Sequence, residues 1–205
     1  MTNITAKDIQ ALRQSTGTGM MDAKKALTEA GGDMERAAEI LREKGIAAAA
    51  KRTDRAQSEG TIGSYLHQQA GRPVIGVLVE LASETDFVAK SDEFQTIAND
   101  IAMHIAAGSP QWVSRDDVPE ADVEKEKELI AAQARNEGKP DHIVDKIVEG
   151  RLNSFFKDNV LLDQEFVRSE AFEGTVGEMV QQLAVRMGEN ISVRRFSRIQ
   201  VGAGS

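Results

Sequence analysis

The sequence holds few side chains of the kinds that make or break bonds. It has no cysteine, which excludes disulfides, thiolate nucleophiles and cysteine-ligated zinc. Its three histidines, His67, His104 and His142, are widely spaced, so they do not predict a histidine metal site. No serine or threonine stands in a nucleophile elbow, and no phosphate-binding loop of the form G-x-x-x-x-G-K-[ST] occurs. We therefore expect neither bond-making enzyme chemistry nor a bound cofactor or metal ion.

One short segment combines a carboxylate with an aromatic ring at a predicted strand-to-helix junction. An apolar run over residues 74–81 predicts a strand, and the apolar spacing after it predicts a helix. The junction between them includes Thr85, Asp86, Phe87 and Val88. Thr85 or Asp86 suits the N-cap of that helix. Phe87 lies seven residues before Phe94 and shares a helical face with it, so core packing remains open beside the other interpretation, a rigid anchor for a protein partner.

An acid–base pair of Asp86 and His104 is an alternative that would make the chain an enzyme. The two residues are 18 positions apart on what the spacing predicts as one helix. At 1.5 Å per residue they would be about 27 Å apart, far beyond the reach of proton transfer. His104 stands at the edge of an apolar stripe, which is more typical of a structural histidine.

The charge balance disfavours a direct nucleic-acid partner. The chain has 33 acidic and 25 basic residues and a net charge of −8, whereas phosphate contacts need a basic face. Arg194, Arg195 and Arg198 form the only dense basic group in the final strand. In an acidic chain this group favours salt bridges, although RNA binding stays open as an alternative. Acidic residues over positions 120–128 alternate with lysines, which is typical of a solvated helix face.

The sequence also argues against a membrane location. No stretch approaches the roughly 18 apolar residues that a membrane span needs. No apolar run resembling a signal peptide follows Met1. We therefore expect a cytoplasmic protein.

Residues 1–45 predict a bundle of three short helices that resembles a ubiquitin-associated domain. Thr5 suits the N-cap of the first helix and Asp33 that of the third. The second helix is expected from about Met20, and Gly45 is expected to end the third. Residues 46–58 are alanine-rich and then basic, which predicts a partly helical linker before a second domain over residues 59–205.

The second domain predicts an α+β core with a three-stranded antiparallel sheet and several packed helices. Residues 61–67 are expected to pair with the run 74–81, which is apolar on both faces and therefore predicts a central, covered strand. A third strand closes the chain, where Val193 and Ile199 share one parity. The predicted helices between the strands lie near residues 94–105, 120–136, 141–158 and 175–187.

Several short motifs occur in a fixed order along nearly the whole chain. The first is Leu12-Arg13 with Thr16-Gly17-Thr18-Gly19-Met20-Met21-Asp22-Ala23-Lys24-Lys25-Ala26-Leu27, and the second is Thr85-Asp86-Phe87-Val88-Ala89-Lys90. Others lie at residues 101–107 with Pro110, and at 138–140, 148–151, 164–167 and 175–177. Together they resemble the bacterial elongation factor Ts family. Each motif is weak alone, but the ordered set is very specific.

The resemblance implies a nucleotide-exchange factor for elongation factor Tu, a translational GTPase. It implies a ubiquitin-associated-like domain followed by an α+β dimerisation core. In the family, the Thr-Asp-Phe-Val segment enters between helices of the GTPase and disturbs its magnesium site. Here that segment is Thr85, Asp86, Phe87 and Val88, and further partner contacts are implied at Met20, Lys24, His104 and Val167.

The chain departs from the longest family members in having room for one sheet-and-helix core instead of two. We therefore expect a homodimer that pairs two cores about a twofold axis, and the lack of cysteine makes it non-covalent. The remaining alternative is a ubiquitin-associated-type adaptor for another protein. That interpretation explains the bundle but gives no reason for the motif at residues 85–90.

Overall fold

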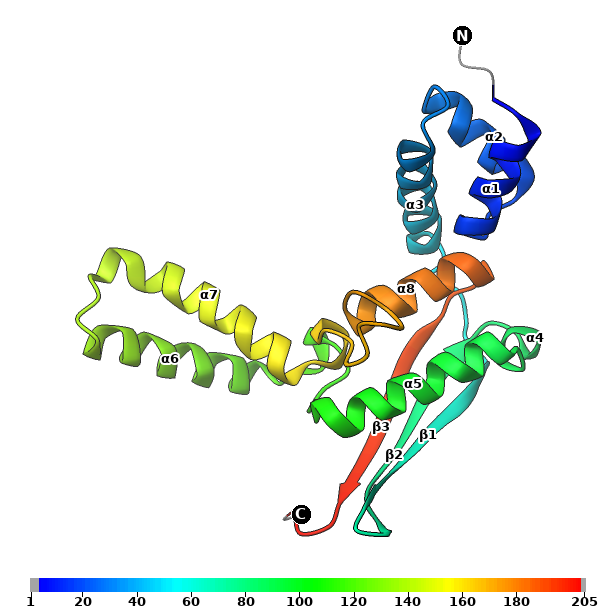
Figure 1. Cartoon of the computed structure of the whole chain (residues 1–205). Helices are drawn as coiled ribbons and strands as arrows, with labels where there is room; N and C mark the ends of the chain where they lie inside the picture. Colours follow the sequence, from blue (N-terminus) through cyan, green and yellow to red (C-terminus); the bar gives the residue numbers. More distant parts are fainter. Residues whose placement is uncertain (1–3, 204–205) are drawn as a thin grey trace.

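The N-terminal part of the chain is a three-helix bundle in the computed structural model, which describes residues 4–203 (Figure 1). Its helices are α1 (Ala6–Thr16), α2 (Met20–Glu29) and α3 (Met34–Ala50). The predicted caps are confirmed, because Thr5 forms a capping box with Asp8, and the Asp33 carboxylate accepts the N–H of Arg36. Residues 1–3 and 204–205, which the predicted domains include, lie outside the described residues.

A small apolar core holds the bundle together. Ala23 and Leu27 of α2 and Ala37 and Leu41 of α3, each pair four positions apart on one helical face, are all buried. Leu12 of α1 completes the contact between the three helices. Several members are alanines, which bury little area, so the bundle draws modest stability from its own core.

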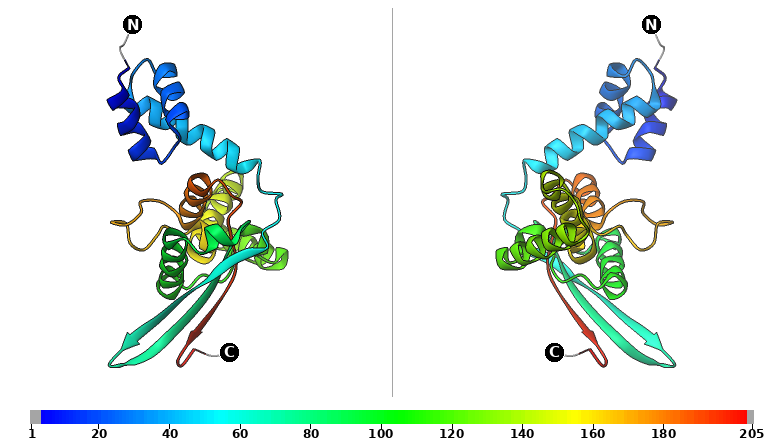
Figure 2. Two further views of the ribbon diagram at one scale, coloured as in Figure 1. Left: turned by 90° about the vertical axis from the view of Figure 1, so that its right-hand side faces the viewer. Right: turned by 90° about the vertical axis from the view of Figure 1, so that its left-hand side faces the viewer.

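Helix α3 runs through Gly45 to Ala50, so the predicted end at Gly45 is wrong. A Cβ at position 45 would lie 2.6 Å from Cγ1 of Val185, which belongs to helix α8 (Val176–Met187). The glycine therefore serves a close helix–helix approach and not a helix end. As a result, residues 46–50 of the expected linker are helical and extend the bundle toward the core (Figure 2).

A three-stranded antiparallel sheet forms the centre of the rest of the molecule, as predicted. Its strands are β1 (Glu59–Gln69), β2 (Arg72–Ser83) and β3 (Ser192–Gln200), and β2 lies in the middle. Strands β1 and β2 meet at a two-residue turn, where Ala70 and Gly71 have φ values of 50° and 79°.

Within the described part of the chain, the helices cover only one face of this sheet. Helix α5 (Asp92–Gly108) packs on β1 and β2, and α8 contributes to the same apolar core. In β2, Val77 and Val79 point into this core and are buried, whereas Leu78 between them is 55% exposed. The prediction of a strand covered on both faces is therefore wrong: β2 is central, but its second apolar face is open.

A bulge changes the predicted parity of the third strand. Glu80 pairs with Arg195, but Leu81 pairs with Val193, so β3 carries one extra residue between these pairs. Val193 consequently faces the core, whereas Ile199 lies on the open face and is 72% exposed. The expectation that Val193 and Ile199 share a face is wrong for this reason.

The other helices lie near the predicted ranges, except that the stretch from Asp86 forms two helices instead of one. They are α4 (Asp86–Ala89), α5, α6 (Glu120–Asn136), α7 (Asp141–Asn159) and α8, with single 3-10 turns at η1 (Arg115–Asp117) and η2 (Leu161–Asp163). Helices α6 and α7 form a hairpin that projects from the core (Figure 1). At its base, Trp112 and Val160 pair in a short parallel bridge.

No helix within residues 4–203 combines the length and the apolar composition that crossing a membrane requires. The helices are instead amphipathic and turn their apolar faces to one another or to the sheet.

Candidate protein-binding site

The corner between β2 and α5, residues 85–88, presents an aromatic ring to solvent. We call it the 85–88 corner. Thr85 caps helix α4, because its Oγ1 accepts the N–H of Val88 at 3.4 Å. Val88 is buried and anchors the underside of the helix in the core. Phe87 is 84% exposed on the outer side, so an anchored helix carries a large apolar side chain outward.

A break in the helix explains why Phe87 is not in the core. Helix α4 ends before Lys90, and Ser91 caps the separate helix α5 through its Oγ, which accepts the N–H of Phe94 at 3.4 Å. The expectation of one continuous helix from Asp86 is therefore wrong. Phe94 is fully buried while Phe87 points outward, so the core interpretation of Phe87 is wrong as well.

A carboxylate stands next to the exposed ring. Lys90 Nζ donates a hydrogen bond of 2.6 Å to Asp86 Oδ2, one helical turn away. This hydrogen bond and the charge of Lys90 lower the pKa of Asp86 below its usual value. The corner therefore places an ionised carboxylate, paired with Lys90, beside an apolar ring, a combination that suits binding to another protein more than acid–base chemistry.

Helix α2 presents a second group of predicted contact residues. Met20 and Lys24 are four positions apart and so lie on one face of the helix, where Met20 is 48% exposed and Lys24 is exposed. This helix belongs to the bundle, whereas α4 lies beside the sheet (Figure 1). The structure therefore does not bring these two groups together in one place.

His104 is buried and contacts the backbone of Val167. Only 2% of His104 is exposed, and its ring stacks on Phe166. Its Nδ1 accepts the N–H of Val167 at 3.2 Å, which leaves the proton on Nε2 to donate to Gln164 Oε1 at 2.9 Å. Burial lowers the pKa of His104, and the hydrogen bond with Gln164 opposes part of that shift.

Val167 itself is 50% exposed. His104 is therefore placed to orient Val167 through the backbone. The alternative of an acid–base pair between Asp86 and His104 has no support, since one lies at an exposed corner and the other in the core.

Two of the three arginines in the basic group of β3 form ion pairs, as predicted for that group. Arg195 Nε lies 2.7 Å and Arg194 Nε 3.9 Å from carboxylate oxygens of Glu80 on β2. Arg198 donates a hydrogen bond of 3.2 Å to the Ala106 carbonyl of α5. These contacts connect β3 to β2 and to α5.

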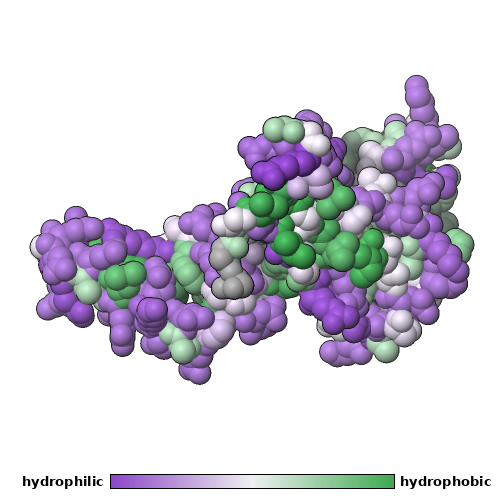
Figure 3. Space-filling view, turned by 90° about the horizontal axis from the view of Figure 1, so that it is seen from below, coloured by the Kyte–Doolittle hydropathy of each residue, from purple (hydrophilic) through white to green (hydrophobic). Residues whose placement is uncertain are grey.

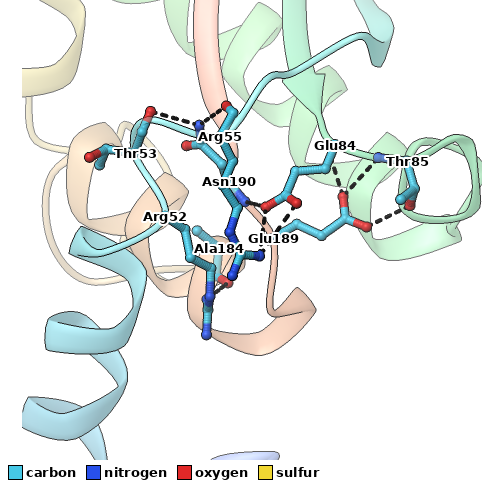
Figure 4. A network of polar contacts seen from close by, with 8 residues as sticks. All are labelled: Arg52, Thr53, Arg55, Glu84, Thr85, Ala184, Glu189 and Asn190. Atoms are coloured by element: carbon cyan, nitrogen blue, oxygen red, sulfur yellow. Dashed lines mark hydrogen bonds and ion pairs between the residues drawn. The ribbon is translucent and has the colours of Figure 1, made fainter.

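Two residues that contact Thr85 and the adjacent Glu84 are not predicted from the sequence. Glu189 and Asn190 lie in the loop between α8 and β3, and their side chain and backbone groups bond to Thr85 and Glu84 (Figure 4). Their partners Glu84 and Thr85 are more than 100 positions away in the sequence. The local sequence shows only that Glu189 follows Gly188, which ends α8. Local spacing holds no information about such a contact.

The family model described as "Elongation factor TS" matches residues 3–173 of the chain. Among curated relatives, "Elongation factor Ts" of Alkaliphilus metalliredigens is 54% identical over 98% of this chain and 91% of its own length. The protein of that name from Thermoanaerobacter sp. (strain X514) is 53% identical over 98% of this chain and 96% of its own length. The protein of that name from Caldanaerobacter subterraneus subsp. tengcongensis is 50% identical over 98% of this chain and 98% of its own length.

Proposed function

The chain belongs to the elongation factor Ts family, and we propose that its 85–88 corner is the segment that opens the nucleotide site of elongation factor Tu. The chain is a guanine-nucleotide exchange factor of translation elongation: it promotes the release of GDP so that GTP can bind. The observation that supports the role of the corner is the outward position of Phe87, 84% exposed, on a helix whose other side is anchored by Val88.

The physical basis of exchange is a difference in affinity for two states of the partner. A GTPase holds its nucleotide through magnesium and backbone groups that surround the phosphates. A factor that distorts this site binds the empty form more tightly than the GDP-bound form. By linkage, factor and nucleotide then weaken each other by the same ratio. A factor with equal affinity for both forms would release no nucleotide.

Phe87 supplies part of this difference if its ring is buried only in the opened partner. Full burial of such a side chain is worth about 2–3 kcal/mol, which corresponds to about 30- to 150-fold in coupling. Asp86 brings a charge to the same place. One ring does not account for the whole effect, so we assign further contacts to Met20 and Lys24 on α2 and to Val167, with His104 as the buried support of Val167.

We infer that exchange is the whole of the chemistry. The side chains at the corner act by burial and charge on the partner and form no bond with it. The proposal includes no direct contact with nucleic acid or a membrane, and it places the protein in the cytoplasm, where its partner in translation acts. We also propose that the chain is divided into a bundle (1–45), a connecting segment (46–58) and a core (59–205). The first residues of the connecting segment continue helix α3.

The open face of the sheet supports the proposal of a non-covalent homodimer. This face carries five large apolar side chains that are 55–72% exposed. They are Ile62, Leu66, Leu78, Ile199 and Val201. The view from below shows a hydrophobic area in the middle of the molecule (Figure 3). Apolar patches of several hundred Å² mark interaction surfaces.

A second copy is the occupant that this face fits best. Two sheets covered by helices on one side only can stack their open faces about a twofold axis and bury them as a sandwich. The ion pair between Glu80 and Arg195 lies within the chain on the same face, so two copies can approach without bringing unpaired charges together.

The decisive experiment is the release of labelled GDP from purified elongation factor Tu, with and without this protein. We expect release to be accelerated, and Phe87→Ala to reduce the stimulated rate while the protein remains folded. Leu129→Ala is the matched control, because Leu129 is an apolar side chain on α6 that is 51% exposed. Unchanged stimulation by folded Phe87→Ala would remove the corner from the mechanism, and no stimulation by the wild type would contradict the function.

A further inference from the structure

The loop between α8 and β3 closes on the 85–88 corner through one carboxylate (Figure 4). Glu189 Oε2 accepts the N–H of Glu84 at 3.0 Å and the N–H of Thr85 at 3.1 Å. Its other oxygen, Oε1, accepts the Thr85 hydroxyl at 2.5 Å. Three donors of two consecutive residues therefore converge on a single side chain that is distant in sequence.

These hydrogen bonds act on the part of the corner that has least support of its own. Helix α4 has only four residues, and a helix of one turn does not persist without outside contacts. The Thr85 hydroxyl donates to Glu189 and accepts from the N–H of Val88, so Glu189 fixes the rotamer that the cap requires. Hydrogen bonds to an ionised acceptor are roughly twice as strong as neutral ones.

A second set of contacts connects the corner to the segment that leads from the bundle. The N–H of Asn190 donates to Glu84 Oε1 at 2.6 Å. The Asn190 side chain amide donates to the carbonyls of Thr53 and Arg55 at 3.0 and 2.8 Å. The Arg55 guanidinium lies 3.4 Å from Glu84. The loop therefore holds both the corner and the chain that follows α3.

We propose that Glu189 is a positioning residue for nucleotide exchange, which holds the 85–88 corner so that Phe87 and Asp86 meet the partner in one fixed orientation. The inference rests on the function proposed for the corner. Other contacts, such as the buried Val88, hold the underside of α4 in the core. The hydrogen bonds of Glu189 instead hold the N-terminal end of α4, next to the residues that point outward. Glu189 is half-buried and polar, so its removal leaves no apolar cavity.

Stimulated GDP release measured over a range of factor concentrations tests this role. For Glu189→Ala we expect the maximal rate to fall by about tenfold or more, since a small misplacement of a positioned group is costly. The concentration for half-maximal release changes little, because the contacts on α2 are intact. Glu189→Gln keeps the shape and one acceptor oxygen, and should restore part of the rate. Glu173→Ala, at an exposed glutamate, is the matched control and should behave as the wild type.

Two further measurements separate positioning from a general loss of structure. In the free protein, hydrogen exchange at the amides of Thr85 and Val88 should quicken in Glu189→Ala while the core strands keep their protection. In a double-mutant cycle, Glu189→Ala should cause a much smaller loss once Phe87 is alanine, because it acts through the corner and only Asp86 then remains to be misplaced. Independent, multiplicative losses would overturn the inference.

The outcomes also distinguish this inference from the proposed function. If Phe87→Ala slows release but both Glu189 variants match the wild type, the corner retains its role and Glu189 has none. If Phe87→Ala itself leaves release unchanged, the role of the corner fails whatever Glu189 does to hydrogen exchange.

Discussion

A buried histidine and a half-exposed valine are joined by one hydrogen bond: the N–H of Val167 donates to Nδ1 of His104 at 3.2 Å. The two residues are 63 positions apart. The bond requires an imidazole that is unprotonated at Nδ1, so the neutral form of His104 belongs to the folded state. The orientation of a surface residue thereby depends on the protonation of one in the core.

The first prediction is a pH dependence of stability that His104 causes. Burial holds the pKa of His104 in the folded state below its usual value of 6.5. Above that value both folded and unfolded states are neutral at this residue. As the pH falls below it, the unfolded state gains a proton first, so the unfolded state is favoured. The free energy of unfolding should therefore decrease more steeply between pH 7 and 5 for the wild type than for His104→Asn.

Urea denaturation at several pH values measures this difference. His104→Asn retains an acceptor near the position of Nδ1 but does not titrate in this range, and the carboxylates contribute equally to both proteins. Parallel curves for the two proteins would show that the histidine is not the source of the pH dependence.

The second prediction concerns the contacts on α2. Because Met20 and Lys24 lie on a different part of the molecule from the 85–88 corner, their loss should affect binding more than opening of the partner. Met20→Ala and Lys24→Ala should each raise the concentration that gives half-maximal GDP release and leave the maximal rate nearly unchanged. Added salt should shrink the effect of Lys24→Ala and not that of Met20→Ala.

Lys7→Ala, at an exposed lysine of α1, controls for a general effect of charge. A fall in the maximal rate at saturating Lys24→Ala would instead place this residue in the opening step.

The third prediction is that a charge on the open sheet face breaks the homodimer. A twofold axis brings every substituted position into the interface twice. Leu78→Arg therefore removes two buried leucines, worth about 1.5–3 kcal/mol each, and weakens the dimer by at least about a hundredfold. Sedimentation at micromolar concentration should show a dimer for the wild type and a monomer for Leu78→Arg, whose circular dichroism should still be that of the folded chain, although loss of the dimer lowers its melting temperature.

Leu129→Arg, on α6 and away from the sheet, should remain a dimer. A wild-type monomer at this concentration would contradict the dimer proposal, and a dimeric Leu78→Arg would contradict the use of this face.

The fourth prediction follows from the close approach of α3 and α8. Alanine in place of a glycine within a helix usually adds about 1 kcal/mol of stability. At Gly45 the added Cβ would lie 2.6 Å from Cγ1 of Val185, and overpacking costs about 1–3 kcal/mol. Gly45→Ala should therefore lower the free energy of unfolding, or leave it unchanged, in the wild-type background.

With Val185→Ala in the same chain, the same substitution should become stabilising. Urea denaturation of the four proteins in this cycle measures the coupling. A gain of about 1 kcal/mol from Gly45→Ala in both backgrounds would show that the helices separate without cost.

Local signals in the sequence predict most of the elements, because the groups that start and stop a helix are neighbours. Thr175 forms a capping box with Glu178 at the start of α8, and Gly188 adopts a left-handed conformation at its end. The same reasoning located the 85–88 corner, since a strand, a cap and an aromatic residue follow one another there. The motifs that resemble the family then assigned it a role.

Most of the wrong predictions depend on distant contacts. Gly45 is predicted to end a helix, because its close contact with Val185 of α8 cannot be seen in the sequence. Leu78 is predicted to be buried, because the sequence does not show that one face of the sheet is open. The exposure of Phe87 depends on a break at Ser91 that the apolar period does not reveal. Glu189 lies about a hundred positions from its partners, and no local pattern predicts such a pairing.

The hairpin of α6 and α7 leaves the core and returns to it at a single point. Gln111 donates its N–H to the Asn159 carbonyl at 2.8 Å, and the N–H of Leu161 donates to Trp112 at 2.9 Å. The two ends of the arm are therefore fixed beside each other whatever lies between them. We therefore expect that the arm can be lengthened, shortened or replaced without shifting the register of the sheet.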